Sequence, residues 1–300
     1  MNQHIKGVLY ALIAASLWGI SGTFVQFLSE QKNVEPAWLI TFRMFSAGTI
    51  LLLIAYFTKD KGVHLIWKDP INRKRLVFFG FTGMFSVQFF FFKAIGYSNA
   101  ATATILQYIG PVLIVIYYSI ISKRLPTIKE FIAIGLALIG TFLLVTHGNF
   151  NSLIISPSAL LFGLLSAVGL MLYSIQPIPI MQKYSAIVVV GWSMLIGGCL
   201  AMCIHPIWEF NGIIDWLTIG SISFILLLGT VLPFSIFLMA LKMIGAQKTS
   251  LISSFEPLSA AIVAIVWLGV QMMWIDWLGA ICIMLTVFLL AKPNESTVKE

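Results

Sequence analysis

One acidic residue of this sequence differs from the other acidic residues because it lies deep within an apolar run. Glu256 is near the middle of the run 246–268, whereas the other acidic residues fall in loops, tails or the ends of such runs. A charge at the centre of a bilayer costs ~2.5–3.5 kcal/mol on insertion scales, so we expect such a residue to face a cavity and to have a specific role. Glu256 could bind a substrate ammonium or take up a proton in place of substrate. Alternatively, it could pair permanently with Arg43 or bond the backbone freed by Pro257.

Two basic residues also lie inside apolar runs. Arg43 is about seven residues, or ~10 Å of helix, from the nearer end of the run 36–57. It could meet a substrate carboxylate, pair with Glu256 in one state of a cycle, or only cap carbonyls and lock two helices. Lys93 lies nearer the end of its run, where a long side chain can extend to the membrane interface.

Pro111 and Pro257 lie near the middle of two other apolar stretches, 100–121 and 246–268. A proline inside a helix removes one backbone hydrogen bond, kinks the helix and leaves a carbonyl unpaired. In a membrane that carbonyl must be met by protein or by cavity water. We therefore predict that the two prolines mark helix breaks beside a central cavity; a static kink that only shapes packing is the alternative.

Polar and aromatic residues near these breaks are candidates for lining a path. Trp18 and Trp192 could stack on a ring or hold a quaternary ammonium through cation–π contact. Helix packing or hydrogen bonding between helices explains each candidate equally well. The other candidates are Gln88, Thr104, Gln107, Tyr108, Tyr173, Gln176, Ser250 and Ser254.

Patterns typical of enzymes, metal sites and nucleotide-driven pumps are missing from the sequence. The four histidines are far apart and lie in tails, loops or run ends, and the three cysteines lie inside apolar runs without a histidine to complete a zinc set. There is also no GxxxxGK[ST] phosphate-binding loop. We expect no metal, no cofactor, no enzyme activity and no direct drive by ATP.

The composition indicates the surroundings of these residues. Hydrophobic residues make up 59% and charged residues 10% of the sequence, and the mean hydropathy is +0.98. Soluble domains are typically about 25% charged, so this apolar surface must face lipid. The net charge of +7 does not indicate nucleic-acid binding, because the basic residues occupy short gaps between apolar runs and form no contiguous basic face.

About 20 helical residues cross a bilayer, and ten apolar runs satisfy that length. We therefore predict an all-α integral membrane protein with ten transmembrane helices. The third and fourth runs, and the eighth and ninth, have very little polar sequence between them. The runs are 7–28, 36–57, 76–97, 100–121, 128–146, 158–181, 185–206, 216–241, 246–268 and 274–291.

The basic residues predict the orientation of these spans. With ten spans both termini lie on one side, and that side carries fifteen of the eighteen Lys and Arg residues, whereas the opposite side has only Lys32. Such a bias places the basic side in the cytoplasm. The fifteen are Lys6, Lys59, Lys61, Lys68, Arg73, Lys74, Arg75, Lys123, Arg124, Lys129, Lys183, Lys242, Lys248, Lys292 and Lys299.

The two halves of the chain are weakly similar to one another. With Pro111 aligned to Pro257, residues 93–116 lie beside residues 239–262, and FIAIGLALIGTFLL lies beside WLGAICIMLTVFLL. Each half, 7–146 and 158–291, holds five spans, so the second half must enter the membrane the other way up. This predicts two inverted repeats, an architecture that supports alternating access around a central site.

The ordered set of motifs resembles the drug/metabolite transporter superfamily, in particular its EamA family. The resemblance covers 7–291 and depends on Leu17-Trp18-Gly19, on Arg43 with Ala47-Gly48, on the stretch from Lys93 to Pro111, on Gly135 and Gly140, and on Ala240, Ala246, Glu256-Pro257 and Gly279. The family usually has a glutamate just after the fourth and ninth spans. Lys123 and Val270 stand near those places here, so no glutamate gate is inferred there.

The resemblance implies a secondary transporter of small metabolites in the cytoplasmic membrane of a bacterium. We expect efflux of amino acids or related compounds by proton exchange. Uptake of a cationic nutrient such as choline is one alternative, and an intramembrane enzyme or a membrane scaffold is another. The expected partners are a small-molecule substrate and the lipid bilayer, with no nucleic acid; a homodimer is an assembly that the sequence leaves open.

Overall fold

The computed structural model describes residues 3–98, 100–123, 125–152, 156–268 and 273–291, and every regular element within these ranges is a helix. Val270, Arg124, Lys292 and Lys299, which entered the sequence predictions, lie outside the described residues. Up to residue 152 the helices are α1 (Gln3–Lys32), α2 (Pro36–Phe57), α3 (Gly62–Lys68), α4 (Pro70–Phe78), the π-helical η1 (Phe79–Phe85), α5 (Ser86–Tyr97), α6 (Ala100–Gln107), α7 (Gly110–Ile121), α8 (Ile128–Thr146) and the 3-10 turn η2 (Phe150–Ser152).

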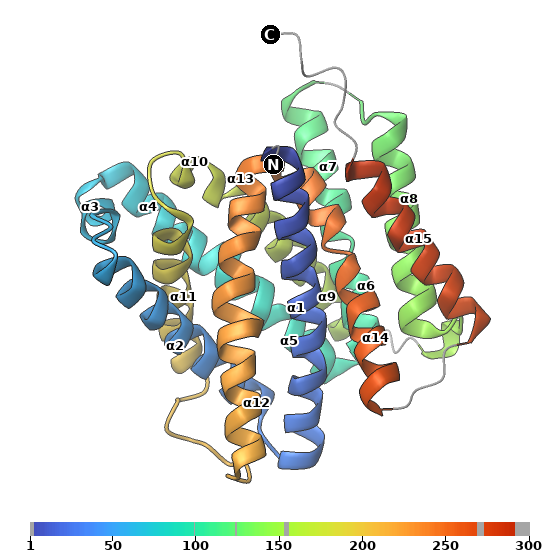
Figure 1. Ribbon diagram of the computed structural model, residues 1–300, viewed down its shortest axis with the longest axis horizontal. Helices are drawn as coiled ribbons and strands as arrows, with labels where there is room; N and C mark the ends of the chain where they lie inside the picture. Colours follow the sequence, from blue (N-terminus) through green and yellow to red (C-terminus); the bar gives the residue numbers. More distant parts are fainter. Residues whose placement is uncertain (1–2, 99, 124, 153–155, 269–272, 292–300) are drawn as a thin grey trace.

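The remaining helices complete the bundle in Figure 1. They are α9 (Pro157–Ile175), α10 (Pro177–Met181), α11 (Ala186–Met202), α12 (Trp216–Leu226), the π-helical η3 (Leu227–Val231), α13 (Leu232–Ile252), α14 (Phe255–Leu268) and α15 (Trp274–Ala291). Figure 1 also shows that α1 begins and α15 ends at the same end of the bundle.

Six of the described helices are long and apolar enough to cross a membrane. They are Gln3–Lys32, Pro36–Phe57, Pro70–Tyr97, Ala103–Ile121, Pro157–Met181 and Trp216–Ile252. Large apolar side chains on the outside of the bundle, such as Ile120, Phe131 and Phe288, are more than half exposed. An all-helical chain with this surface is an all-α membrane protein, because lipid is the solvent that accepts such side chains.

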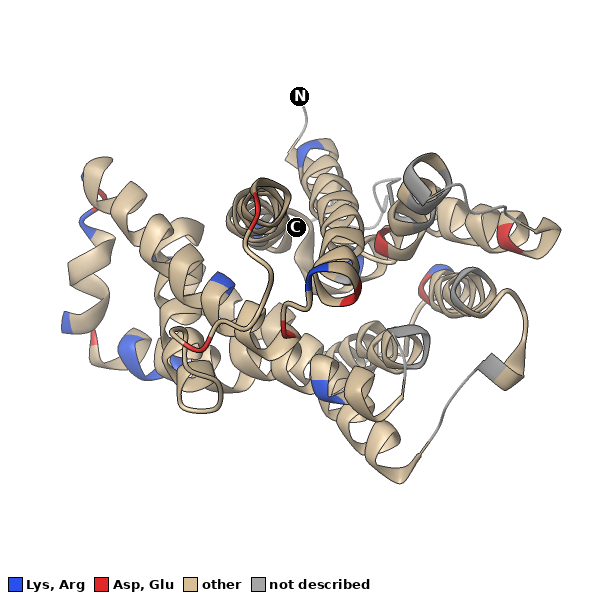
Figure 2. Cartoon of the chain, turned by 90° about the horizontal axis from the view of Figure 1, so that it is seen from below, with Lys and Arg blue, Asp and Glu red and all other residues tan. Residues whose placement is uncertain are grey.

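Neighbouring helices in space come from opposite parts of the sequence. The helix α2 packs along α11, and α8 packs along α15. Towards the middle of Figure 1, α1 packs against α13 and α14, and α9 packs against α5, α6 and α7. Seen from below in Figure 2, the helices are uncharged over most of their length.

Glycines allow two of these pairs to approach at backbone distance. A Cβ added at Gly48 of α2 would lie 2.6 Å from the Leu195 amide nitrogen of α11. A Cβ added at Gly140 of α8 would lie 2.9 Å from the Gly279 carbonyl oxygen of α15. Small residues that bring backbones together are the usual means of helix association in lipid, where no water drives the contact.

Two apolar stretches are interrupted one turn before a proline. The helix α6 ends at Gln107 and α7 begins at Gly110, with Pro111 in its first turn. Likewise, α13 ends at Ile252 and α14 begins at Phe255, two residues before Pro257. A first-turn proline sacrifices no helical hydrogen bond, so the chain forms a break followed by a new helix rather than a kink at the proline itself.

Several helix ends differ from the predicted runs. The first helix extends from Gln3 to Lys32 rather than over 7–28, and the third span starts at Pro70 rather than at residue 76. The predicted runs 216–241 and 246–268 are joined inside α13, where Gly245 has φ +79° and turns the chain without a loop. Hydropathy locates apolar segments, but it does not register a helix that continues into polar sequence.

Ion pairs connect the ends of the helices. Lys32 at the end of α1 donates to Asp215 at 2.6 Å, and Asp215 also accepts from the Thr218 amide as the N-cap of α12. The hydrogen bond from Lys32, together with those from Thr218, lowers the pKa of Asp215 to about 2. Lys183 pairs with Asp69 at 2.7 Å, which holds the pKa of that carboxyl well below its usual range.

Candidate functional site

Glu256 is the second residue of α14, directly after the break at Ser253 and Ser254. The two serines and Pro257 are buried, whereas Glu256 keeps part of its surface exposed. A carboxylate in the first turn of a helix is stabilised by the N-terminal end of the helix dipole. The break therefore places a negative charge where the backbone favours it.

Tyr108 connects the first break to the second. Its hydroxyl donates to the Ser253 carbonyl at 2.8 Å and lies 3.5 Å from Oε2 of Glu256. The Ser253 carbonyl also accepts from the Glu256 amide at 2.9 Å. A residue that the sequence places beside Pro111 thus meets the acidic residue that precedes Pro257.

Arg43 on α2 does not form an ion pair with Glu256 among the described residues. Its Nη2 donates instead to Oε1 of Gln88 on α5, and its guanidinium lies over the Phe92 ring, 5.7 Å from the centroid. Its buried Nε has no hydrogen-bond partner within the described part of the chain. The permanent Arg43–Glu256 pair considered from sequence is therefore not the arrangement in this structure.

Gln107 and Ser254 make backbone contacts at the two breaks. Nε2 of Gln107 donates to the Val87 carbonyl at 3.3 Å, which ties the end of α6 to α5. The Ser254 hydroxyl donates to the Leu251 carbonyl, three residues earlier in the chain, at 2.7 Å. Gln107 therefore holds two helices together, and Ser254 satisfies a carbonyl that the break exposes.

Trp18 and Tyr173 meet across two phenylalanines. The Trp18 ring lies 5.0 Å from both Phe234 and Phe237 by centroid, and the Tyr173 ring lies 5.7 Å and 5.5 Å from the same two rings. Phe79 stacks on the other side of Tyr173 at 6.1 Å. The Trp18 indole nitrogen and the Tyr173 hydroxyl are buried without a hydrogen-bond partner among the described residues. We name these five residues the aromatic cluster.

Gly19 lies between the aromatic cluster and the break before Pro257. A Cβ added at Gly19 would lie 2.3 Å from both the Glu256 carbonyl oxygen and the Ser259 hydroxyl. Only glycine lets α1 approach α14 this closely, and Trp18 is its immediate neighbour. Trp18 of the aromatic cluster is therefore one residue away from the contact between α1 and the Glu256 backbone.

Gln176 and Trp192 make their contacts elsewhere in the bundle. Nε2 of Gln176 donates to the Thr82 hydroxyl of η1 at 2.9 Å. The Trp192 indole donates to the Val63 carbonyl of α3 at 3.1 Å, and its ring packs edge-on against Trp67. These contacts support helix packing at the α3–α4 end of the molecule.

Sequence reasoning missed Phe92, Phe234 and Phe237. Phe92 could have been found, because it follows Gln88 by four residues and therefore shares its helix face. The two phenylalanines of α13 carried no comparable signal among the 23 of the sequence. Within the described residues, no group of three His, Cys, Asp or Glu side chains could hold a metal ion.

Comparisons with known proteins cover almost the whole chain. The sequence profile of the EamA-like transporter family matches residues 5–146 and 157–292. The uncharacterized inner membrane transporter YicL of Salmonella typhimurium is 37% identical over 98% of both chains. The uncharacterized transporter YwfM of Bacillus subtilis is 26% identical over 97% of this chain and 96% of its own.

A solved crystal structure shares the fold. It superposes with a TM-score of 0.76 over 94% of this chain and 95% of its own, at 16% sequence identity. At that identity the likeness concerns the arrangement of helices alone.

Proposed function

This chain belongs to the EamA-like transporter family, and on that basis we propose that it exports an amino acid or related small metabolite in exchange for protons. It is a multi-pass transporter of the cell membrane and not an enzyme. The observation that carries the proposal is the carboxylate of Glu256, a partly exposed residue at a helix break, 3.5 Å from the Tyr108 hydroxyl.

An exchange cycle follows from these groups. With substrate absent, Glu256 takes up a proton, which removes a charge that is costly in the membrane interior. With substrate bound, the carboxylate meets the substrate ammonium while Arg43, which has an unused donor, meets the substrate carboxylate. Because proton and substrate compete for one carboxylate, their movements are obligatorily coupled.

Alternating access requires two comparable halves, and we propose that the chain forms ten spans in two inverted repeats. Three features support this. The packing of α1 against α13 and α14 has a counterpart in the packing of α9 against α5, α6 and α7. The π-helical segments η1 and η3 interrupt one span in each half, and so do the breaks before Pro111 and Pro257. In inverted-repeat carriers such broken helices surround the substrate.

Substitution of Glu256 by glutamine tests the coupling role. The protein is reconstituted in proteoliposomes with an imposed pH gradient, and exchange is followed over a panel of labelled amino acids and amines. Glu256→Gln is expected to abolish the dependence of flux on the pH gradient, because the amide cannot exchange a proton.

Glu209→Gln is the matched control, since Glu209 is an exposed loop carboxylate. An unchanged rate and pH profile in Glu256→Gln would remove Glu256 from the coupling mechanism. No flux of any panel member, with folded protein, would reject the metabolite-carrier proposal.

Uptake of a cationic nutrient such as choline is the second candidate. The observation that favours it is the aromatic cluster, whose Trp18 directly precedes the glycine that contacts the Glu256 backbone. Aromatic faces attract quaternary ammonium groups, and a carboxylate adds a counter-charge. Labelled choline in the same panel separates the candidates: saturable choline uptake without amino-acid exchange supports this second function.

A further inference from the structure

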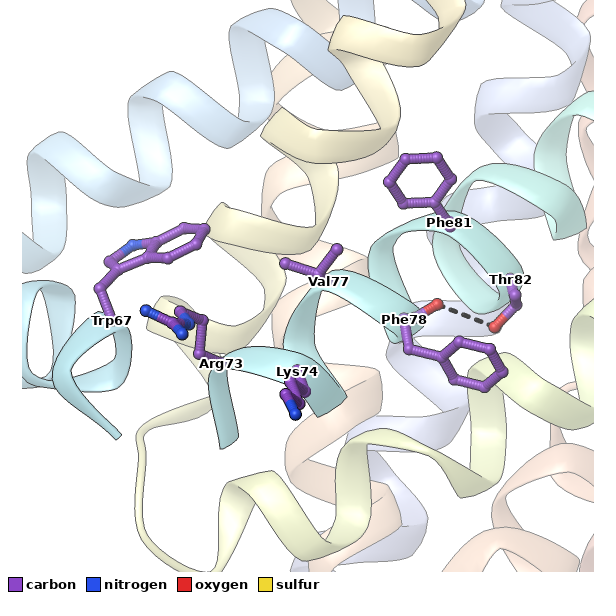
Figure 3. A pocket seen from close by; sticks show the side chains of 7 residues that line it. All are labelled: Trp67, Arg73, Lys74, Val77, Phe78, Phe81 and Thr82. Carbon is purple, nitrogen blue, oxygen red and sulfur yellow. Dashed lines mark hydrogen bonds between the residues drawn. The ribbon is translucent and has the colours of Figure 1, made fainter. Parts of the chain in front are cut away.

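An open groove of about 700 Å³ lies at the α3–α4 end of the bundle, away from Glu256. Figure 3 shows its wall, which consists of Trp67 from α3 and of residues from α4 and η1. Arg73 and Lys74 lie at one end, and Val77, Phe78 and Phe81 continue along the same helix. The groove is therefore basic at one end and apolar along the rest of its length.

The two basic residues are available to a ligand. Arg73 and Lys74 are exposed, and no ion pair within the described part of the chain involves either of them. Asp69, the acidic residue that precedes them on α4, already accepts from Lys183 and Asn72. Two adjacent cations without a carboxylate partner attract an anion.

The apolar part of the groove faces outward. Phe78 is 59% and Phe81 46% exposed. From Arg73 to Phe81 the helix rises ~12 Å, which is part of the length of one acyl chain in a leaflet.

We propose that this groove binds an anionic phospholipid of the adjacent leaflet. The phosphate lies between Arg73 and Lys74, and one acyl chain follows Val77, Phe78 and Phe81 into the bilayer. A zwitterionic phospholipid fits the apolar wall equally well, but its ammonium or choline group offsets the attraction to the two cations. The site is therefore selective for net negative headgroups.

Native mass spectrometry of the detergent-purified protein tests this proposal. Phosphatidylglycerol and phosphatidylcholine with identical acyl chains are titrated separately, and the bound fraction is measured. We expect one phosphatidylglycerol to bind at least about tenfold more tightly than phosphatidylcholine. Removing both charges in the double variant Arg73→Gln/Lys74→Gln should weaken phosphatidylglycerol binding by roughly thirty-fold.

The control is Lys59→Gln/Lys61→Gln, which removes two exposed charges from the turn between α2 and α3, outside the groove. The control should keep the wild-type affinity, and circular dichroism should show that both double variants are folded. Equal binding of the two lipids, or equal weakening in both double variants, would overturn the proposal.

A soluble competitor separates a lipid site from a phosphate site. Glycerol 3-phosphate carries the headgroup chemistry without acyl chains, so it should displace phosphatidylglycerol only at concentrations at least about a hundredfold higher than the lipid itself. Displacement at equal concentration would show that the apolar wall contributes nothing and would reject the lipid as the ligand.

Discussion

The helix breaks before Pro111 and before Pro257 have similar backbones, but the residue that precedes the proline is a packed glycine in the first and a glutamate in the second. Before Pro111 stands Gly110, where an added Cβ would lie 2.8 Å from Cδ2 of Leu170 and 3.1 Å from the Ala167 carbonyl oxygen. Before Pro257 stands Glu256, which is partly exposed and within reach of Tyr108. One break is closed by packing against α9, and the other presents a carboxylate.

This difference teaches that a shared backbone form need not carry a shared role. The first break supplies support, because its Tyr108 donates to the Ser253 carbonyl that the second break exposes. The second break supplies the charge. In the exchange cycle proposed above, one half of the chain holds the coupling carboxylate, and both halves have the kind of helix break that surrounds the substrate in inverted-repeat carriers.

Arg43 gives the largest expected effect on this comparison, because in the proposed exchange cycle it binds the substrate together with Glu256 of the charged break. Arg43→Gln should lower exchange in proteoliposomes by at least about tenfold, since a charge-assisted hydrogen bond contributes ~1.5–3 kcal/mol. Arg43→Lys keeps the charge but loses the planar guanidinium that bonds Gln88 and covers Phe92. Its exchange rate should therefore lie between those of the wild type and Arg43→Gln. Lys93→Gln, at an exposed position, is the control. Wild-type exchange in Arg43→Gln would show that the basic residue has no part in transport.

Gly110→Ala tests the closed break. The added methyl meets the Ala167 backbone and Leu170, and such overpacking costs ~1–3 kcal/mol, so the midpoint of thermal unfolding in detergent should fall. Gly135→Ala in α8 is the opposite case, because nothing lies within 4 Å of its Cβ position. That variant should be neutral or slightly more stable. If both variants behave alike, the close contact at Gly110 is not a constraint.

Tyr108→Phe tests the link between the breaks. It removes one hydroxyl and should lower stability by ~1 kcal/mol, the net contribution of a typical hydrogen bond. Exchange should also become less sensitive to the pH gradient, because the hydroxyl beside Glu256 is gone. Tyr97→Phe, at an exposed position, should match the wild type in both measurements. A Tyr108→Phe variant with wild-type stability would indicate that the two breaks are independent.

The smallest expected effect is that of Asp215→Asn at the distant end of α12. Asparagine keeps the cap on α12 but loses the charge that pairs with Lys32. Hydrogen bonds from Lys32, and after it from Thr218, lower the pKa of Asp215 from 3.8 to about 2, so the stabilisation is present above pH 3.8 and is lost as the pH falls through 2. The difference in thermal midpoint between wild type and variant should be small at pH 7 and should shrink as the pH falls through 2. A difference that stays undiminished at low pH would assign it to something other than the charge of Asp215.

The sequence predicted the membrane fold and the neighbourhood of the site, but not the pairings. Hydropathy located the apolar segments, and the prolines located both breaks to within one turn. The partner of Arg43 could not be predicted, because Glu256 and Gln88 were both plausible acceptors and only the packing of α2 on α5 selects between them. The π-helical segments had no sequence signal, since they depend on how neighbouring helices accommodate an extra residue.

The turn at Gly245 has a mechanical consequence. Only one residue separates the two arms of α13, and its φ of +79° is one that few other residues adopt. A loop of several residues would absorb movement of one arm before it reached the other. Here the joint is one glycine, so a change in its two torsion angles alone alters the angle between the arm that carries Phe234 and Phe237 and the arm that leads to Glu256.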